Sequence, residues 1–189
     1  GSEMCIRDSH ATHPERFSFA ELDQRIATAA AAFRRQGVQE GDVVALFAEN
    51  SPRWLVADQG LMRCGAADAV RGAAAPVEEL RYILEDCNAS ALVVQNADLW
   101  RRLDLTASQR QGLRLVLQLE GEPEQGVLGW EAFLASGAGQ QTVKPRADRK
   151  AIATVLYTSG TTGQPKGVPL TRGTVAMAIG FTRGRSFFS

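Results

Sequence analysis

Residues 151–167 read AIATVLYTSGTTGQPKG, an apolar run followed directly by hydroxyls, glycines and one lysine. The run 151–156 has the length and composition of a buried strand. The residues after it suit phosphate, because glycines let backbone N–H groups converge on a ligand and Ser and Thr add hydroxyl donors. Lys166 brings a positive charge to the outer phosphates. The stretch therefore predicts a strand that ends in a phosphate-binding loop.

Two well-known phosphate loops do not match this stretch. A Walker A loop needs G-x-x-x-x-G-K-[ST], whereas here Gln164 and Pro165 separate Gly163 from Lys166 and a glycine follows the lysine. The dinucleotide pattern G-x-G-x-x-G is absent as well, because no glycine stands two residues before or after Gly160. The alternative interpretation is a surface turn rich in Gly, Ser and Thr between two strands.

Helical and strand patterns alternate along the chain before the loop. Ser18 and Glu21 form an S-x-x-E capping box at the start of a helix predicted over residues 18–37. The apolar run 43–48 predicts a strand that is covered on both faces. Similar patterns predict helices over 51–65, 77–87, 99–103 and 128–134, and strands over 66–70, 91–94 and 113–119. This alternation predicts an α/β fold with a largely parallel sheet flanked by helices, in which ligands gather at the carboxyl ends of the strands.

The predicted organisation has four parts. Residues 1–12 lack helical or strand periodicity and the pattern of a signal peptide, so we expect a non-native or disordered leader, with a short native tail as the alternative. Residues 13–136 form a first α/β part, and the polar stretch 137–150 is a connector. Residues 151–189 hold the strand, the phosphate loop and the start of a next subdomain, which is truncated, and the origin of residues 184–189 stays open.

Composition excludes several function classes. The formal net charge of +0 argues against general attraction to nucleic acid or to anionic membranes. No apolar run approaches the roughly 18 residues of a membrane span. The 3 cysteines form no C-x-x-C pair, and both histidines lie in the first 13 residues, so neither a zinc site nor a histidine-based triad is expected. Cys64 and Cys87 are expected to be small buried hydrophobes in a reducing compartment.

Residues 157–167 resemble the signature phosphate loop of the adenylate-forming, or AMP-binding, superfamily of acyl-CoA synthetases and their relatives. Residues 49–54 resemble a segment in which many members carry Asn-x-Pro-x-Trp. Residues 68–72 are similar to the branch of long-chain acyl-CoA synthetases and acyl-acyl carrier protein synthetases. The resemblance runs over roughly residues 16–183 and corresponds to the opening part of the N-terminal domain of whole members. The chain therefore reads as a truncated piece of that fold.

The resemblance implies an enzyme that uses ATP and Mg2+ to join a long-chain fatty acid to a thiol. The acid would become an acyl-adenylate, and coenzyme A or acyl carrier protein would then accept the acyl group. Tyr157 is expected to be a packed strand end, and Gly167 is expected to let the chain turn into the next strand. The residues implied to contact the β- and γ-phosphates are Thr158, Ser159, Gly160, Thr161, Thr162, Gly163 and Lys166.

The catalytic residues of such an enzyme are implied to lie beyond Ser189, so we expect the 189-residue chain to be inactive by itself. Two other functions stay open. One is a different adenylating ligase, for an aryl acid or an amino acid, because the substrate pocket would also lie beyond Ser189. The other is a non-catalytic nucleotide-binding or interaction module. No nucleic-acid partner and no transmembrane segment are expected, and the whole enzyme would be cytoplasmic or peripheral to a membrane.

Overall fold

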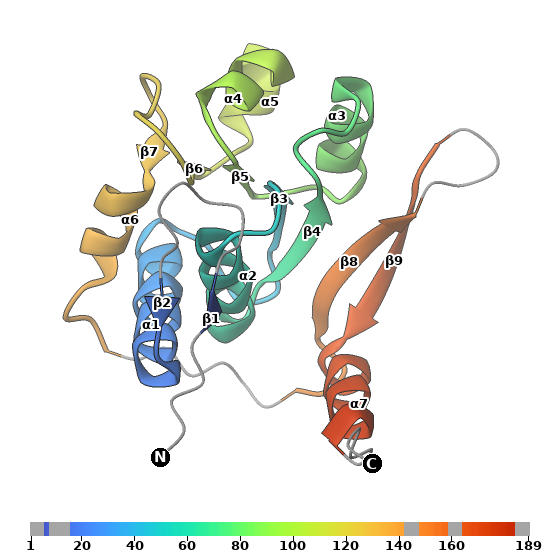
Figure 1. The fold of residues 1–189 in the computed structure, drawn as a ribbon. Coiled ribbons are helices and arrows are strands. Elements are labelled where there is room, and N and C mark those ends of the chain that lie inside the picture. The colour runs from blue at the N-terminus through green and yellow to red at the C-terminus, as the bar shows by residue number, and fades with distance from the viewer. Residues whose placement is uncertain (1–5, 8–15, 142–147, 159–163, 184–189) are drawn as a thin grey trace.

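A computed structural model describes residues 6–7, 16–141, 148–158 and 164–183 (Figure 1). Within these ranges seven strands form one sheet, and two further strands, β1 (Ile6–Arg7) and β2 (Arg16–Phe17), pair with each other. The strands of the sheet are β3 (Val43–Phe47), β4 (Ala67–Arg71), β5 (Ala91–Val94), β6 (Val116–Gln118), β7 (Leu128–Gly129), β8 (Ile152–Thr158) and β9 (Lys166–Thr171). Their order is β7-β6-β5-β3-β4-β8-β9, and every neighbouring pair is parallel except β8 with β9. The predicted α/β fold with a largely parallel sheet is confirmed.

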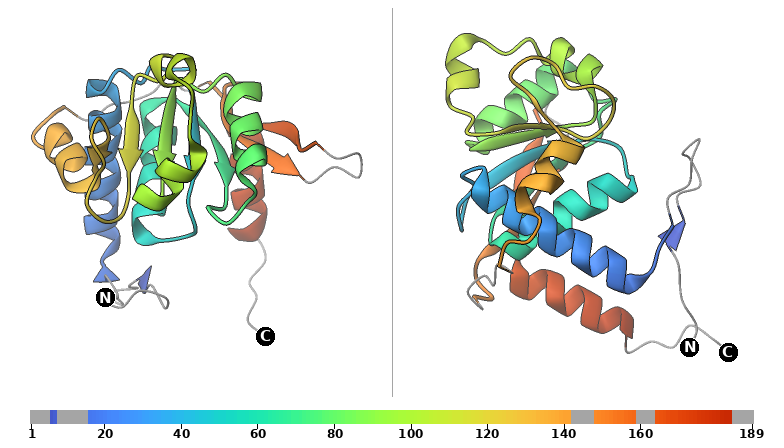
Figure 2. Two further views of the ribbon diagram at one scale, coloured as in Figure 1. Left: turned by 90° about the horizontal axis from the view of Figure 1, so that it is seen from above. Right: turned by 90° about the vertical axis from the view of Figure 1, so that its left-hand side faces the viewer.

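Helices cover both faces of this sheet (Figure 2). The helices are α1 (Phe19–Arg35), α2 (Pro52–Cys64), α3 (Val77–Asp86), α4 (Ala97–Leu103), α5 (Ala107–Gln111), α6 (Trp130–Gly137) and α7 (Arg172–Arg183). On one face α1, α2 and α6 form an apolar cluster with Val44 and Leu46 of β3. On the other face α3 and α4 cluster with Ala45 and Phe47 of the same strand. The central strand is therefore buried on both faces, as its continuous apolar sequence predicts.

The helix ends follow the local sequence signals. Ser18 accepts a hydrogen bond from the Glu21 backbone N–H at 3.3 Å, and the Glu21 carboxylate accepts one from the Ser18 N–H at 2.8 Å, which completes the predicted capping box. Gly65 ends α2 with a φ of 94°, a left-handed conformation that favours glycine. Among the described residues, no helix is long and apolar enough to cross a bilayer.

Two of the predicted elements differ from those in the structure, and the short strands β1 and β2 are not predicted. A single helix is predicted over 128–134, but Leu128 and Gly129 form β7, and α6 begins at Trp130. The strand predicted over 113–119 is limited to β6, and helix α5 is not predicted at all. The first error arises because Leu128 pairs with Leu117 of β6, a contact between segments that local periodicity does not report.

The last two strands join the same sheet as the first five. Residues 148–151 lead into β8, which pairs in parallel with β4 through Asp68↔Thr154 to Val70↔Leu156. After the loop, β9 returns antiparallel to β8, and α7 follows directly. The sheet is thus continuous across the predicted connector, and the division into a first part and a next subdomain stays a prediction.

Candidate phosphate-binding hairpin

The predicted phosphate loop lies at the end of the β8–β9 hairpin, whose two strands project together from the sheet (Figure 1). Thr158 is the last residue of β8 and Lys166 is the first of β9, and the two are paired across the ladder. Both side chains are exposed. Ser159, Gly160, Thr161, Thr162 and Gly163 lie outside the described residues. The structure therefore places a hydroxyl and an ammonium side by side at the base of the loop.

The alternation of β8 sets the direction of these groups. Ala153, Val155 and Tyr157 are buried, whereas Ile152, Leu156 and Thr158 are exposed. Paired residues of an antiparallel ladder point to the same face, so Lys166 shares the exposed face with Thr158. Among the described residues Lys166 makes no ion pair. An exposed hydroxyl and an exposed cation on one face suit an anionic ligand with several oxygens, such as a polyphosphate.

Tyr157 attaches the hairpin to helix α3. Its hydroxyl donates a hydrogen bond to Asp86 Oδ2 at 2.7 Å, and its side chain is only 7% exposed. Burial, followed by the hydrogen bond to Asp86, raises the pKa of Tyr157, so its phenol stays protonated at neutral pH. The expectation that Tyr157 is a packed strand end is confirmed. Sequence reasoning missed Asp86, because 71 positions separate it from Tyr157 and no local pattern connects them.

Gly167 has a different role from the one expected. It is the second residue of β9 and pairs with Tyr157, so it lies within a strand and not at a turn. A Cβ at this position would stand 3.0 Å from Cζ of Tyr157 and 3.1 Å from Cγ1 of Val155. A side chain at this position would therefore press on the Tyr157 ring, and glycine lets that ring pack closely against the backbone of β9.

The two described cysteines are not activated. Cys64 is fully buried at the end of α2, and its thiol donates to the Leu61 carbonyl oxygen at 3.2 Å. Burial raises the pKa of Cys64, and it raises the pKa of Cys87 to about 11. A thiol nucleophile needs a lowered pKa, so neither residue is activated. The prediction of a small buried hydrophobe is confirmed for Cys64, whereas Cys87 is only partly buried.

Asp68 is a buried acid on β4 that sequence reasoning assigned no role. It is 2% exposed, and neither of its carboxylate oxygens finds a hydrogen-bond donor among the described residues. Burial and the nearby carboxyl of Asp58 raise the pKa of Asp68 to about 8. The neighbouring residue on β8 is Thr154, which lies on the same strand as Thr158 but four positions earlier. Asp68 is therefore buried within the sheet, away from the exposed side chains of Thr158 and Lys166.

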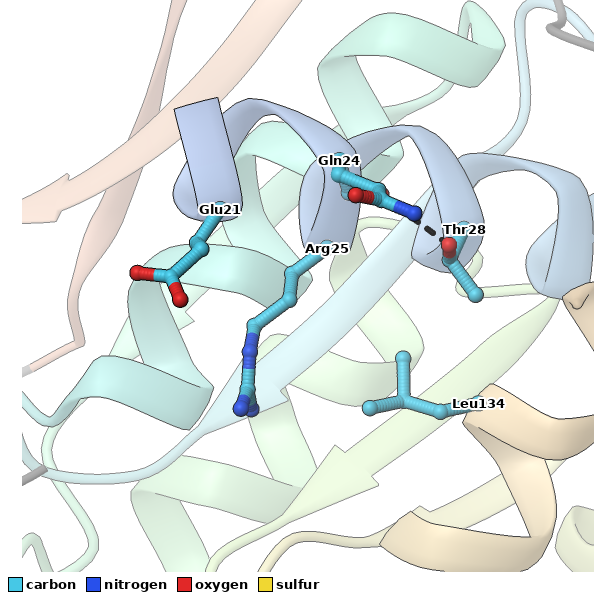
Figure 3. A pocket seen from close by; sticks show the side chains of 5 residues that line it. All are labelled: Glu21, Gln24, Arg25, Thr28 and Leu134. Atoms are coloured by element: carbon cyan, nitrogen blue, oxygen red, sulfur yellow. Dashed lines mark hydrogen bonds between the residues drawn. The ribbon is translucent and has the colours of Figure 1, made fainter. Parts of the chain in front are cut away.

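Two surface hollows in the described part of the chain lie away from the hairpin. One is lined by Glu21, Gln24, Arg25 and Thr28 of α1 with Leu134 of α6, and Thr28 Oγ1 donates to the Gln24 carbonyl oxygen at 3.0 Å (Figure 3). The other lies beside β7 and includes Arg53, Pro123, Trp130 and Glu131. Strands β7 and β9 are at opposite edges of the sheet, so neither hollow belongs to the predicted phosphate site.

Comparison with known proteins decides the family. A family model described as AMP-binding enzyme matches residues 4–186. The chain belongs to this AMP-binding family. The matched residues include the hairpin described above, so the resemblance of residues 157–167 to the family's phosphate loop agrees with the match over the whole chain.

Individual members of the AMP-binding family cover most of the chain. It is 36% identical over 190 residues to the probable acyl-activating enzyme 16, chloroplastic, of Arabidopsis thaliana, covering 90% of this chain and 26% of that protein. It is 35% identical to the long-chain-fatty-acid–[acyl-carrier-protein] ligase AEE15, chloroplastic, of the same plant, with the same coverage. The apo structure of Mycobacterium smegmatis MbtA matches with a TM-score of 0.72 and 33% identity, over 86% of this chain and 30% of that one. The chain thus spans about a quarter of the length of the curated relatives it matches.

Proposed function

We propose that this chain supplies the triphosphate-binding hairpin of a longer ATP-dependent ligase. The ligase would activate a long-chain fatty acid as an acyl-adenylate and transfer the acyl group to the thiol of coenzyme A or acyl carrier protein. The observation that carries the proposal is the ladder pair Thr158↔Lys166, which puts a hydroxyl and a cation together at the base of a loop rich in Gly, Ser and Thr. Enzymes of the AMP-binding family use ATP, typically with Mg2+.

Each residue of the hairpin has a separate task in this proposal. Lys166 neutralises charge on the outer phosphates, and the Thr158 hydroxyl donates a hydrogen bond to a phosphate oxygen. Ser159, Gly160, Thr161, Thr162 and Gly163 would add hydroxyl and backbone N–H donors. When the carboxylate oxygen of the acid attacks the α-phosphorus, the bond to the β-phosphate breaks and pyrophosphate leaves. The hairpin would hold that departing group and stabilise its charge.

The residues described here fit a polyphosphate but leave the metal unassigned. Within the described ranges, no group of three His, Cys, Asp or Glu side chains is arranged to hold a metal ion. We therefore assign no residue of this chain to Mg2+, which would neutralise phosphate charge when it is bound. The hairpin's own contribution is limited to one fixed cation and its hydroxyl and N–H donors.

The fatty acid is proposed from the two plant relatives. One is named as a ligase for a long-chain fatty acid and an acyl carrier protein, and the other as an acyl-activating enzyme. Residues 68–72, in β4 and directly after it, have the sequence DAVRG that suggested this branch. There Arg71 Nε pairs with Glu79 Oε1 of α3 at 2.8 Å. The ion pair joins the end of β4 to the first turns of α3, next to the strand that precedes the phosphate loop.

The proposal is tested with the complete polypeptide that continues past Ser189. We expect fatty-acid-dependent exchange of pyrophosphate into ATP, and we expect Lys166→Ala to lower kcat/KM for ATP by about 10- to 100-fold, since a hydrogen bond to a charged group contributes roughly 1.5–3 kcal/mol. Lys150→Ala is the matched control. Lys150 is exposed too, but it precedes β8, and the strand alone spans roughly 20 Å from Ile152 to Thr158.

The outcomes separate the candidate functions. Equal kcat/KM for ATP in Lys166→Ala and Lys150→Ala would contradict the assignment of the hairpin to triphosphate binding. Exchange that depends on an amino acid or an aryl acid, and not on a fatty acid, would keep the adenylating site and replace the substrate class. The 189-residue chain alone is expected to release no pyrophosphate above the level of its Lys166→Ala variant.

A further inference from the structure

The end of strand β8 is held differently from its middle. Pairing between β8 and β4 reaches only to Leu156, which pairs with Val70. Tyr157 and Thr158 continue beyond it and pair with Gly167 and Lys166 of β9. The part of the hairpin that carries the proposed phosphate contacts has therefore left the parallel sheet, and its direction must be set by other contacts.

Among the described residues, one such contact is made by Tyr157. Its hydroxyl donates a hydrogen bond to Asp86 Oδ2 at 2.7 Å. Its ring lies against Gly167, where an added Cβ would stand 3.0 Å from Cζ of Tyr157 and 3.1 Å from the hydroxyl oxygen of Tyr157. The ring therefore packs beneath the backbone of β9 at the residue directly after Lys166. A single side chain thus touches both strands of the hairpin and links them to α3.

Helix α3 is a firm anchor for this link. Leu80 and Ile83 of α3 are fully buried in the cluster that also contains Tyr157. Asp86 is the last residue of the helix, and its second oxygen, Oδ1, accepts a hydrogen bond from Tyr82 at 3.2 Å. Tyr82 lies four residues earlier on the same helix and orients the carboxylate. Its ring packs against the same apolar cluster, and the change Tyr82→Phe keeps that ring and removes only the hydroxyl.

We propose that Tyr157 and Asp86 are positioning residues for the phosphate site. Their hydrogen bond lets α3 set the direction in which the base of the hairpin presents Thr158 and Lys166. Tyr157 itself faces the buried side of β8, whereas Thr158 and Lys166 face the exposed side, so the pair acts on the ligand only through the backbone. The identity of the ligand in this inference rests on the proposed function. The attachment of the hairpin to α3 rests on the fold alone.

The first test measures the attachment in the 189-residue chain by hydrogen–deuterium exchange. Tyr157→Phe and Asp86→Ala are expected to speed amide exchange in residues 164–171 by roughly tenfold, because each variant removes a hydrogen bond to a charged group. Asp86→Asn keeps an acceptor oxygen and is expected to restore most of the protection. Tyr82→Phe is the matched control, since it removes the other hydroxyl from the same carboxylate and should leave residues 164–171 unchanged. Peptides from α1 and α2 report whether each variant is folded.

The second test uses the complete polypeptide and separates positioning from packing. Tyr157→Phe is expected to raise KM for MgATP by about fivefold to tenfold and to leave KM for the carboxylic acid unchanged, whereas Tyr82→Phe changes neither. Unchanged amide exchange in both Tyr157→Phe and Asp86→Ala would overturn the inference. Faster exchange with an unchanged KM for MgATP would also overturn it, because the contact would then support the fold only. A wild-type polypeptide that exchanges no pyrophosphate would overturn the proposed function instead, and amide exchange would then decide the attachment by itself.

Discussion

At the scale of single residues, Asp68 links pH to the stability of the fold. Its pKa is raised from the ordinary value of 3.8 to about 8, so the folded chain binds a proton that the unfolded chain releases between these two pH values. Below about pH 4 the Asp68 carboxyl is protonated in both states, and its raised pKa does not lower the free energy of unfolding. As pH rises toward 8, keeping this buried group protonated costs more free energy, and the fold loses stability. We expect the free energy of unfolding to fall by up to about 1.4 kcal/mol per pH unit in this window because of Asp68.

The substitution Asp68→Asn tests this dependence, because asparagine keeps the shape of the side chain and does not ionise. Urea unfolding of the wild type and the variant at pH 5, 6.5 and 8 should show the variant gaining stability relative to the wild type as pH rises. Comparing the two proteins cancels the titration of other groups. A difference between them that does not change with pH would contradict the assignment.

At the scale of elements, the contact between α1 and α6 depends on a glycine. A Cβ on Gly137 would stand 2.2 Å from the carbonyl oxygen of Thr28 and 2.7 Å from the backbone nitrogen of Ala32. The helices also meet through Phe33 and Phe133, whose ring centroids are 4.6 Å apart. Gly137→Ala would force the helices apart and is expected to lower the free energy of unfolding by about 1–3 kcal/mol.

The control for Gly137→Ala is Ala135→Ser, which changes an exposed residue of the same helix. Chemical unfolding of both variants measures the difference, and Ala135→Ser should stay within about 0.5 kcal/mol of the wild type. If Gly137→Ala is as stable as the control, the close approach of α6 to α1 is not a constraint on this chain.

At the scale of the whole molecule, the β8–β9 hairpin presents an exposed apolar strip at one edge of the sheet. Leu156 is 43% exposed and Val168 is 46% exposed, and the two are paired across the ladder. Strand β9 is the edge strand of the described sheet, and unpaired edges with apolar side chains promote association. We expect the 189-residue chain to bind a hydrophobic dye and to self-associate through this strip.

Replacing Leu156 and Val168 together by Thr should reduce dye fluorescence and shift the sedimentation profile toward the monomer. Threonine is β-branched, and this shape suits a strand. Phe19→Ser provides the comparison, since Phe19 is 56% exposed at the start of α1, on a different part of the molecule. An equal effect of the two changes would mean that association is not localised to the hairpin.

Sequence patterns predicted those parts of the fold whose signals are local. The capping box at Ser18, the end of the helix predicted over 51–65 and the apolar strand predicted over 43–48 each depend on residues within one turn or one strand, and each is confirmed. The predictions failed at Leu128 and at Gly167, where the partner is distant in sequence. The strand order, with β8 beside β4, was not predictable either, because the pairing of parallel strands depends on crossovers that local periodicity does not contain.

The features of the candidate site also fall into those that are local in sequence and those that depend on distant residues. The amino-acid sequence by itself determined that a loop of glycines, hydroxyls and one lysine follows a buried strand, since those properties belong to consecutive residues. Only the tertiary structure decided that Thr158 and Lys166 face each other, that Gly167 makes room for the Tyr157 ring, and that Asp86 attaches the hairpin to α3. The physical reason is that composition specifies which groups can bind phosphate, whereas the direction of those groups depends on ladder pairing and on one hydrogen bond between residues 71 positions apart.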